Sequence, residues 1–137
     1  MTHDLDRFVA AQAGTHDNAL AELRRGRKAS HWMWWEFPQL PLGHSSTARH
    51  YALASADEAR AYLRHPLLGA RLIETVAAAV AAPGSAEAIF GGIDAVKLCS
   101  SLTLFAAVAD DPAPFRAGLA RFFGGEEDSA TLQLLAV

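Results

Sequence analysis

Residues 95–109 read AVKLCSSLTLFAAVA. Placed on a helix, the apolar side chains of this stretch cover more than one face instead of forming a single stripe, which is typical of a helix enclosed by its neighbours. Lys97, Ser100 and Ser101 interrupt the apolar surface at three- and four-residue spacing and so share one side. The stretch therefore predicts a central buried helix with one polar edge that could form the wall of a cleft.

Amphipathic patterns on both sides of this stretch predict further helices joined by short turns. Periodicity and helix-end signals place them over residues 4–13, 15–26, 45–54, 55–64, 66–82, 85–90, 112–124 and 128–135. Ser55, Ser85, Asp94 and Asp128 are the expected N-caps, and Pro66 suits the first position of a helix. We predict a mainly α protein, a single compact domain over residues 1–137 with seven or eight short helices around the helix at about 95–109.

Composition limits the class of protein. A chain of 137 residues with 51% hydrophobic and 20% charged residues suits one domain with a buried core. The net charge of −3 argues against general nucleic-acid binding. No apolar run reaches the roughly 18 residues of a membrane span. The single Cys99 cannot form an intramolecular disulfide, and no secretory signal is evident, so we expect a cytoplasmic protein.

The least generic segment is residues 31–40, HWMWWEFPQL, which holds all three tryptophans and follows a basic run at residues 24–28. A flat heterocycle can stack on indole while a neighbouring cation holds a phosphate, so the segment favours a nucleotide-like ligand. The alternative is structural, because tryptophans in a non-helical segment also fill a core or cover one end of a helix bundle.

The candidate catalytic groups are Glu36 and His44. Aromatic surroundings would desolvate Glu36 and raise its pKa, although it could equally pair with Arg27 or Lys28. His44 could supply an acid or base, or it could simply lead into a helix. The candidate ligand-binding residues are Arg27, Lys28, His31, Trp32, Trp34, Phe37, Gln39, Lys97, Ser100, Ser101 and Asp128. The six histidines lack ligand spacing, so we expect no metal and no cofactor.

Several motifs resemble a bacterial family of unknown function, DUF1810. They include SHWMW at 30–34 with FPQ at 37–39, YALAS at 51–55, HPLLG at 65–69 and FFGG at 122–125. The resemblance extends over residues 5–135. Members are sometimes labelled calpastatin-like, but 51% hydrophobic residues do not suit a disordered inhibitor.

The later block is also similar to a helical superfamily of N-glycosidases, the NADAR-like enzymes, which act on ADP-ribose-like compounds and riboflavin-pathway intermediates. There a Lys-Phe-like element on a helix, here residues 97–105, precedes a short terminal element, here Asp128 and Thr131. The chain departs from these enzymes at their early-helix glutamate, since residues 45–55 contain no acid. This resemblance implies an N-glycoside hydrolase or a binder of a nucleotide-like small molecule.

The alternative function is a non-catalytic protein-interaction module in which residues 31–40 form an exposed anchor, because Trp and Arg dominate interface energetics. The exposure of the three tryptophans distinguishes the two hypotheses. So does a cavity that joins residues 31–40 to the polar edge at Lys97 and Ser100. The sequence gives no oligomeric state.

Overall fold

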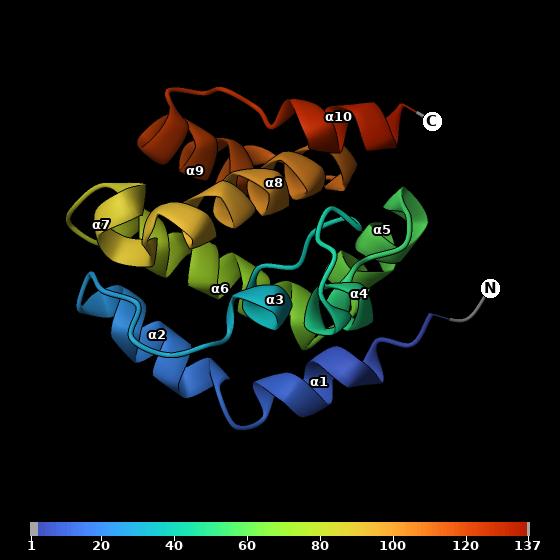
Figure 1. Ribbon diagram of the computed structural model, residues 1–137, viewed down its shortest axis with the longest axis horizontal. Coiled ribbons are helices and arrows are strands. Elements are labelled where there is room, and N and C mark those ends of the chain that lie inside the picture. The colour runs from blue at the N-terminus through green and yellow to red at the C-terminus, as the bar shows by residue number, and fades with distance from the viewer. Residues whose placement is uncertain (1–2, 137) are drawn as a thin grey trace.

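The computed structural model describes residues 3–136, which form ten α-helices and no strand (Figure 1). The helices are α1 (Asp6–Gln12), α2 (His16–Arg24), α3 (Met33–Glu36), α4 (Ser46–Tyr51), α5 (Ala56–Arg64), α6 (Leu68–Ala81), α7 (Ala86–Phe90), α8 (Gly92–Val108), α9 (Ala113–Phe123) and α10 (Ser129–Leu135). The prediction of a mainly α fold is confirmed. The helices number more than the seven or eight expected, in part because α3 forms one turn inside the proline-containing segment before Pro38 stops it.

Local capping chemistry sets several helix starts as expected. The side chains of Ser55, Ser85 and Asp128 each accept a hydrogen bond from a backbone N–H in the first turn of α5, α7 and α10. Asp94 is not the N-cap of α8, because the chain already turns at Gly91, whose φ is +82°, and the helix begins at Gly92.

Pro66 does not open α6, which begins at Leu68. His65 satisfies the start of this helix instead. Its ring nitrogen Nδ1 accepts hydrogen bonds from the backbone N–H groups of Leu67 and Leu68, each at 3.2 Å. A side-chain nitrogen therefore does the capping, and Pro66 lies in the turn before the helix.

The expected central helix is α8, which contacts α5, α7, α9 and α10. Leu98, Leu102, Leu104 and Phe105 on this helix are all at most 1% exposed. These side chains lie on different faces over about two turns, which confirms that this part of α8 is enclosed, whereas Val96 nearer its start is 63% exposed. In Figure 1, α6 lies below α8 and α2 lies below α6, while α9 packs against both long helices.

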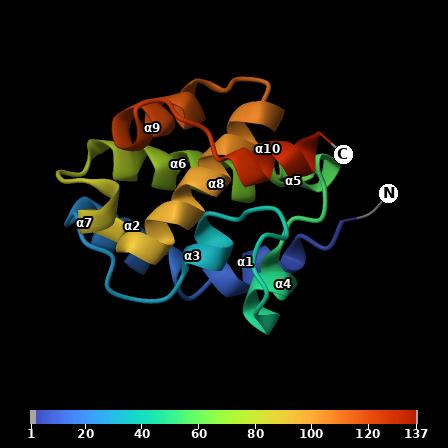
Figure 2. The ribbon, with the colours of Figure 1, turned by 45° about the horizontal axis from the view of Figure 1, so that its top comes forward.

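The tryptophan segment lies where α3 meets α1 and α4, in front of the first turns of α8 (Figure 2). It is therefore held between the N-terminal helices and the central helix. Among residues 3–136, no helix combines the length and the apolar character that a membrane crossing requires.

Gly69 allows α5 and α6 to approach each other closely. A Cβ at this position would lie 2.1 Å from the carbonyl oxygen of Leu63, a backbone atom that cannot move aside alone. We expect Gly69→Ala to lower the free energy of unfolding by about 1–3 kcal/mol, because overpacking outweighs the helix-propensity gain of up to about 1 kcal/mol. Urea denaturation measures this. Gly14→Ala is the control, since nothing lies within 4 Å of its Cβ, and equal effects of the two substitutions would contradict the account.

Candidate functional site

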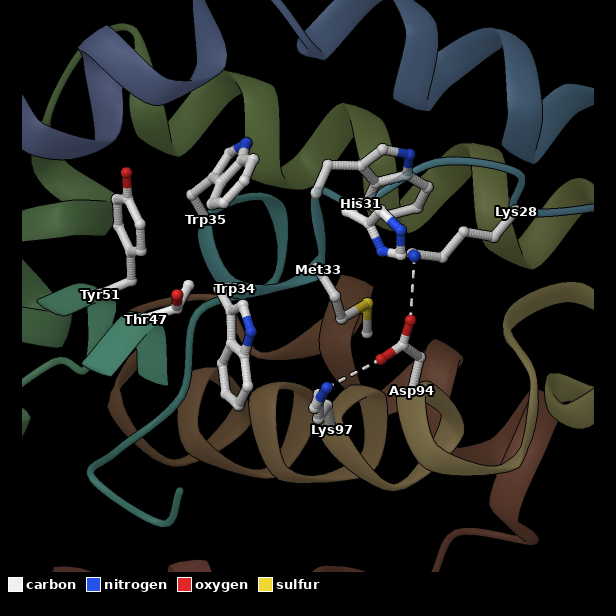
Figure 3. Close-up of a pocket in the computed structure, with 10 residues that line it drawn as sticks. Lys28, His31, Met33, Trp34, Trp35, Thr47, Tyr51, Asp94 and Lys97 are labelled. Atoms are coloured by element: carbon white, nitrogen blue, oxygen red, sulfur yellow. Dashed lines mark hydrogen bonds and ion pairs between the residues drawn. The ribbon is translucent and has the colours of Figure 1, made fainter. Parts of the chain in front are cut away.

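A cleft of about 480 Å³ opens along the tryptophan segment (Figure 3). We call it the tryptophan cleft, and its lining residues are Lys28, His31, Trp32, Met33, Trp34, Trp35, Thr47, Tyr51, Asp94 and Lys97. Figure 3 shows that the lining is polarised. Trp34, Trp35 and Tyr51 gather at one end, which we call the aromatic end. Lys28, His31, Asp94 and Lys97 gather at the other, the cationic end.

The wall of the cationic end is held by the buried carboxylate of Glu22 on α2. It accepts hydrogen bonds from the backbone N–H groups of Ala29 and Ser30, the Ser30 hydroxyl and the indole N–H of Trp32, at 2.6–2.9 Å. Burial alone would raise the pKa of Glu22, but these hydrogen bonds outweigh it and lower the pKa from 4.5 to about 2. Glu22 thus fixes both the loop after α2 and the plane of Trp32.

Asp94 connects this loop to α8. Its Oδ2 lies 2.9 Å from Nζ of Lys28, and its Oδ1 accepts a hydrogen bond of 2.9 Å from Nζ of Lys97. Burial tends to raise the pKa of Asp94, but the two ammonium groups more than offset this and lower it. Asp94 is therefore ionised at neutral pH and holds two cations on one side of the cleft.

The Lys97 ammonium also lies over the ring of Trp34, 4.2 Å from its centroid, a distance typical of a cation–π contact. Trp34 itself is half-buried. Gly43 leaves room for it, because a Cβ there would lie 3.2 Å from Cη2 of Trp34 and 2.6 Å from the Ala48 methyl. The indole is thereby held between the loop before α4 and the cation on α8.

Trp34 and Lys97 also line a second cavity of about 450 Å³, so this pair stands between the two spaces. The other lining residues of the second cavity are Gln39, Leu42, Gly43, Ile93, Val96, Ser100, Asp128 and Ala130. The tryptophan segment and the polar edge of the central helix therefore meet, as the small-molecule hypothesis required.

The remaining tryptophans are fixed by hydrogen bonds. Trp35 is half-buried, and its indole N–H donates to Oγ1 of Thr15 at 2.8 Å. Its ring lies 5.0 Å from that of Tyr51, centroid to centroid. Trp32 is only 1% exposed, so it presents little surface to the cleft. Trp34 and Trp35 are thus the indoles that a ligand could reach.

Glu36 lies outside both cavities. Its side chain is 1% exposed, and its Oε1 lies 2.9 Å from Nδ1 of His16, which in turn lies 3.1 Å from Glu74 through Nε2. Burial raises the pKa of Glu36, although the hydrogen bond and charge of His16 oppose the shift. The direction of the pKa shift agrees with the sequence, but the partner is His16 instead of Arg27 or Lys28.

The structure brings most of the candidate residues to the two cavities. Those that line the tryptophan cleft are Lys28, His31, Trp32, Trp34 and Lys97. Those that line the second cavity are Trp34, Gln39, Lys97, Ser100 and Asp128. The candidates that line neither are Arg27, Glu36, Phe37, His44 and Ser101.

Simple physical reasons explain why these candidates do not line either cavity. Arg27 and His44 are exposed on loops away from the cleft lining. Phe37 is 1% exposed and packs edge-on against Phe90 in the core, 5.7 Å between ring centroids. Ser101 is 1% exposed, with its hydroxyl enclosed and without a hydrogen-bond partner among residues 3–136, so it faces the core instead of the ligand wall.

Sequence reasoning did not single out Glu22, Tyr51 or the bridging role of Asp94, and it included Trp35 only as part of the tryptophan segment. The spacing of Asp94 and Lys97, three residues apart on a helix, was a usable signal for their ion pair. Nothing in the sequence pointed to Glu22, whose partners lie in a loop. Among residues 3–136, no group of three or more His, Cys, Asp and Glu side chains is arranged to hold a metal ion.

Residues 2–135 match the model of a family described as proteins of unknown function, DUF1810. The chain belongs to this family. It is also similar to the crystal structure of the conserved hypothetical protein Rv1873 from Mycobacterium tuberculosis, with 51% sequence identity and a TM-score of 0.96. That alignment covers 98% of this chain and 97% of the other. A comparison with curated proteins gives no match.

In this DUF1810 chain, Glu22 makes the free energy of unfolding depend on pH in the acid range. Its pKa of about 2 in the folded protein lies below the ordinary 4.5, so its stabilisation is complete above pH 4.5 and disappears as the pH falls toward 2. We expect Glu22→Gln to lower the free energy of unfolding at pH 7 by about 1–3 kcal/mol, because the new NH₂ group faces N–H donors. We also expect a flatter loss of stability in acid.

Chemical denaturation between pH 2 and pH 7 measures both effects. Glu127→Gln is the control, because Glu127 is exposed. If the free energy of unfolding of Glu22→Gln fell with decreasing pH as steeply as that of the unsubstituted protein, the account of a lowered Glu22 pKa would be contradicted.

Proposed function

We propose that this protein binds a small, planar, anionic molecule of the nucleotide-like class in the tryptophan cleft. The ring would stack at the aromatic end, and the anionic group would lie at the cationic end. The observation that carries the proposal is the half-buried Trp34 with the Lys97 ammonium 4.2 Å from its ring centroid, beside a second lysine held by the same carboxylate.

The charges at the cationic end support binding of an anion. Two ammonium groups, on Lys28 and Lys97, face the single carboxylate of Asp94 and leave one positive charge in excess. Each ammonium has three N–H donors, of which Asp94 takes one. Lys28 gives another to the carbonyl oxygen of Ser30, at 2.6 Å. Further donors stay available to a phosphate or carboxylate, and His31 on the same wall could add one more.

The cleft supports binding better than hydrolysis. Its one carboxylate, Asp94, has a lowered pKa and both oxygens on lysines, so it cannot deliver a proton to a leaving base. Glu36, the carboxylic acid with a raised pKa, lies outside the cleft. The second candidate is N-glycoside hydrolysis, as the remote resemblance implies. One observation favours it: Asp128 lines the adjoining second cavity with one carboxylate oxygen that has no partner among residues 3–136, and this oxygen could stabilise positive charge on a sugar.

A small ligand also suits the tryptophans better than a protein partner does. An anchor for a protein interface would project into solvent. Here Trp32 is 1% exposed, and Trp34 and Trp35 are half-buried in the wall of a recess. This supports the small-molecule hypothesis over the non-catalytic interaction module.

Isothermal titration with AMP, ADP and flavin mononucleotide tests the proposal. We expect at least one to bind, and we expect Lys28→Ala and Trp34→Ala each to raise its Kd about tenfold, since each removes about 1–2 kcal/mol of charge or stacking interaction. Arg27→Ala is the matched control, because Arg27 is a nearby exposed cation that does not line the cleft.

Two outcomes of these titrations count against the proposal. No binding heat with any of these ligands at millimolar concentration would contradict the proposal, as would an equal loss of affinity in Arg27→Ala and Lys28→Ala. Chromatography of the same mixtures separates the two candidates, because release of free base from a nucleotide would favour hydrolysis.

A further inference from the structure

The second cavity has a lining that differs from that of the tryptophan cleft. It lies between the loop after α3, the first half of α8 and the start of α10. Figure 2 shows these three segments side by side. Its surface is mostly apolar, with Leu42, Val96 and Ala130 among the lining residues, and the indole of Trp34 borders it. Such a space suits the faces of a flat ring.

Gln39 is the polar side chain that this space leaves without a protein partner. It is 7% exposed, yet its side-chain amide makes no hydrogen bond to any of residues 3–136. Its atoms are not sealed either, because the enclosed side-chain polar atom without a partner in this range belongs to Ser101. The amide therefore opens into the cavity that Gln39 lines.

The backbone of Gln39 explains why the residue is placed there but not why it is Gln. Its carbonyl oxygen accepts a hydrogen bond of 2.9 Å from the backbone N–H of Leu53, which fixes the loop to the segment after α4. Any residue type could make that bond. Because no protein group satisfies the amide, its hydrogen bonds are open to water or to a molecule that enters the cavity, and a molecule with a matching edge would give this side chain a specific partner.

The donor and acceptor of the Gln39 amide determine which hydrogen-bonding groups such a partner carries. Gln presents an N–H donor beside a C=O acceptor, and its complement is an edge with a C=O acceptor beside an N–H donor. We infer that the second cavity binds a small planar ring with a lactam-type edge, read by the Gln39 amide, with Trp34 and the apolar side chains of Leu42 and Val96 against the ring.

Asp128 gives the same cavity a further acceptor. Its Oδ2 accepts hydrogen bonds from the hydroxyl of Ser100, and from the backbone N–H and hydroxyl of Thr131, at 2.6–3.1 Å. Its Oδ1 has no partner among residues 3–136. A second N–H or a hydroxyl on the ring would find this oxygen, so the cavity favours ligands rich in donors over fully methylated ones.

The site stands apart from the proposed function of the tryptophan cleft, because a neutral ring can fill the second cavity without using the anion-binding lysines. Two matched pairs of neutral probes test it, uracil against 1,3-dimethyluracil and 2-pyridone against N-methyl-2-pyridone. The methyl groups remove the N–H donor and keep the ring. Saturation-transfer NMR titrations give the affinity of each probe.

We expect uracil or 2-pyridone to bind, and its methylated partner to bind at least about tenfold more weakly. Gln39→Leu keeps the side-chain volume and removes the amide, so the ratio within each pair should fall to about one. Val96→Phe should weaken all four probes, because Val96 is 63% exposed and a larger side chain there fills the cavity without disturbing the core. Lys28→Ala should leave the probes unaffected.

Three results would overturn the inference: no binding of any probe to the unsubstituted protein, equal affinities within both pairs, or unchanged discrimination in Gln39→Leu. If Gln39→Leu failed to fold, full probe binding by Val96→Phe would overturn it instead. Failure of the probes together with intact nucleotide binding would remove this site and leave the tryptophan cleft standing. Probe binding without nucleotide binding would keep this site and remove the proposed function of the tryptophan cleft.

Discussion

The Asp94 carboxylate is the contact on which the arrangement of the site depends. One oxygen holds Lys28 from the loop after α2, the other holds Lys97 from α8, and both nitrogen–oxygen distances are 2.9 Å. A half-buried charge of this kind is tolerable because it is fully paired. The pairing fixes Lys97 over the Trp34 ring, and that contact forms the boundary between the tryptophan cleft and the second cavity.

Local chemistry made much of the fold predictable. Ser55, Ser85 and Asp128 cap helices through hydrogen bonds to residues three positions away, so the sequence carries the whole interaction. The enclosure of α8 was predictable for a similar reason, because its apolar residues occupy more than one face. The prediction of an N-cap failed for Asp94, because the backbone conformation of Gly91 starts α8 at Gly92.

The site was predictable only where sequence neighbours stay neighbours in space. Lys28, His31 and Trp34 reach one cleft because one loop and one helical turn carry them. Ser100 and Ser101 show the limit: adjacent residues on a helix point about 100° apart, so one lines a cavity and the other faces the core. The partners of Glu22 and Glu36 depended on packing between separate segments, which no local pattern reports.

The central claim is that a planar anionic ligand stacks on Trp34, and the indole N–H resonances of the three tryptophans test it most directly. In a nitrogen–proton correlation spectrum recorded during titration with AMP, ADP and flavin mononucleotide, we expect the Trp34 signal to move furthest. The Trp32 signal should stay nearly still, because its N–H is buried on Glu22 at 2.9 Å. Absence of any shift, or a shift led by Trp32, would contradict the account.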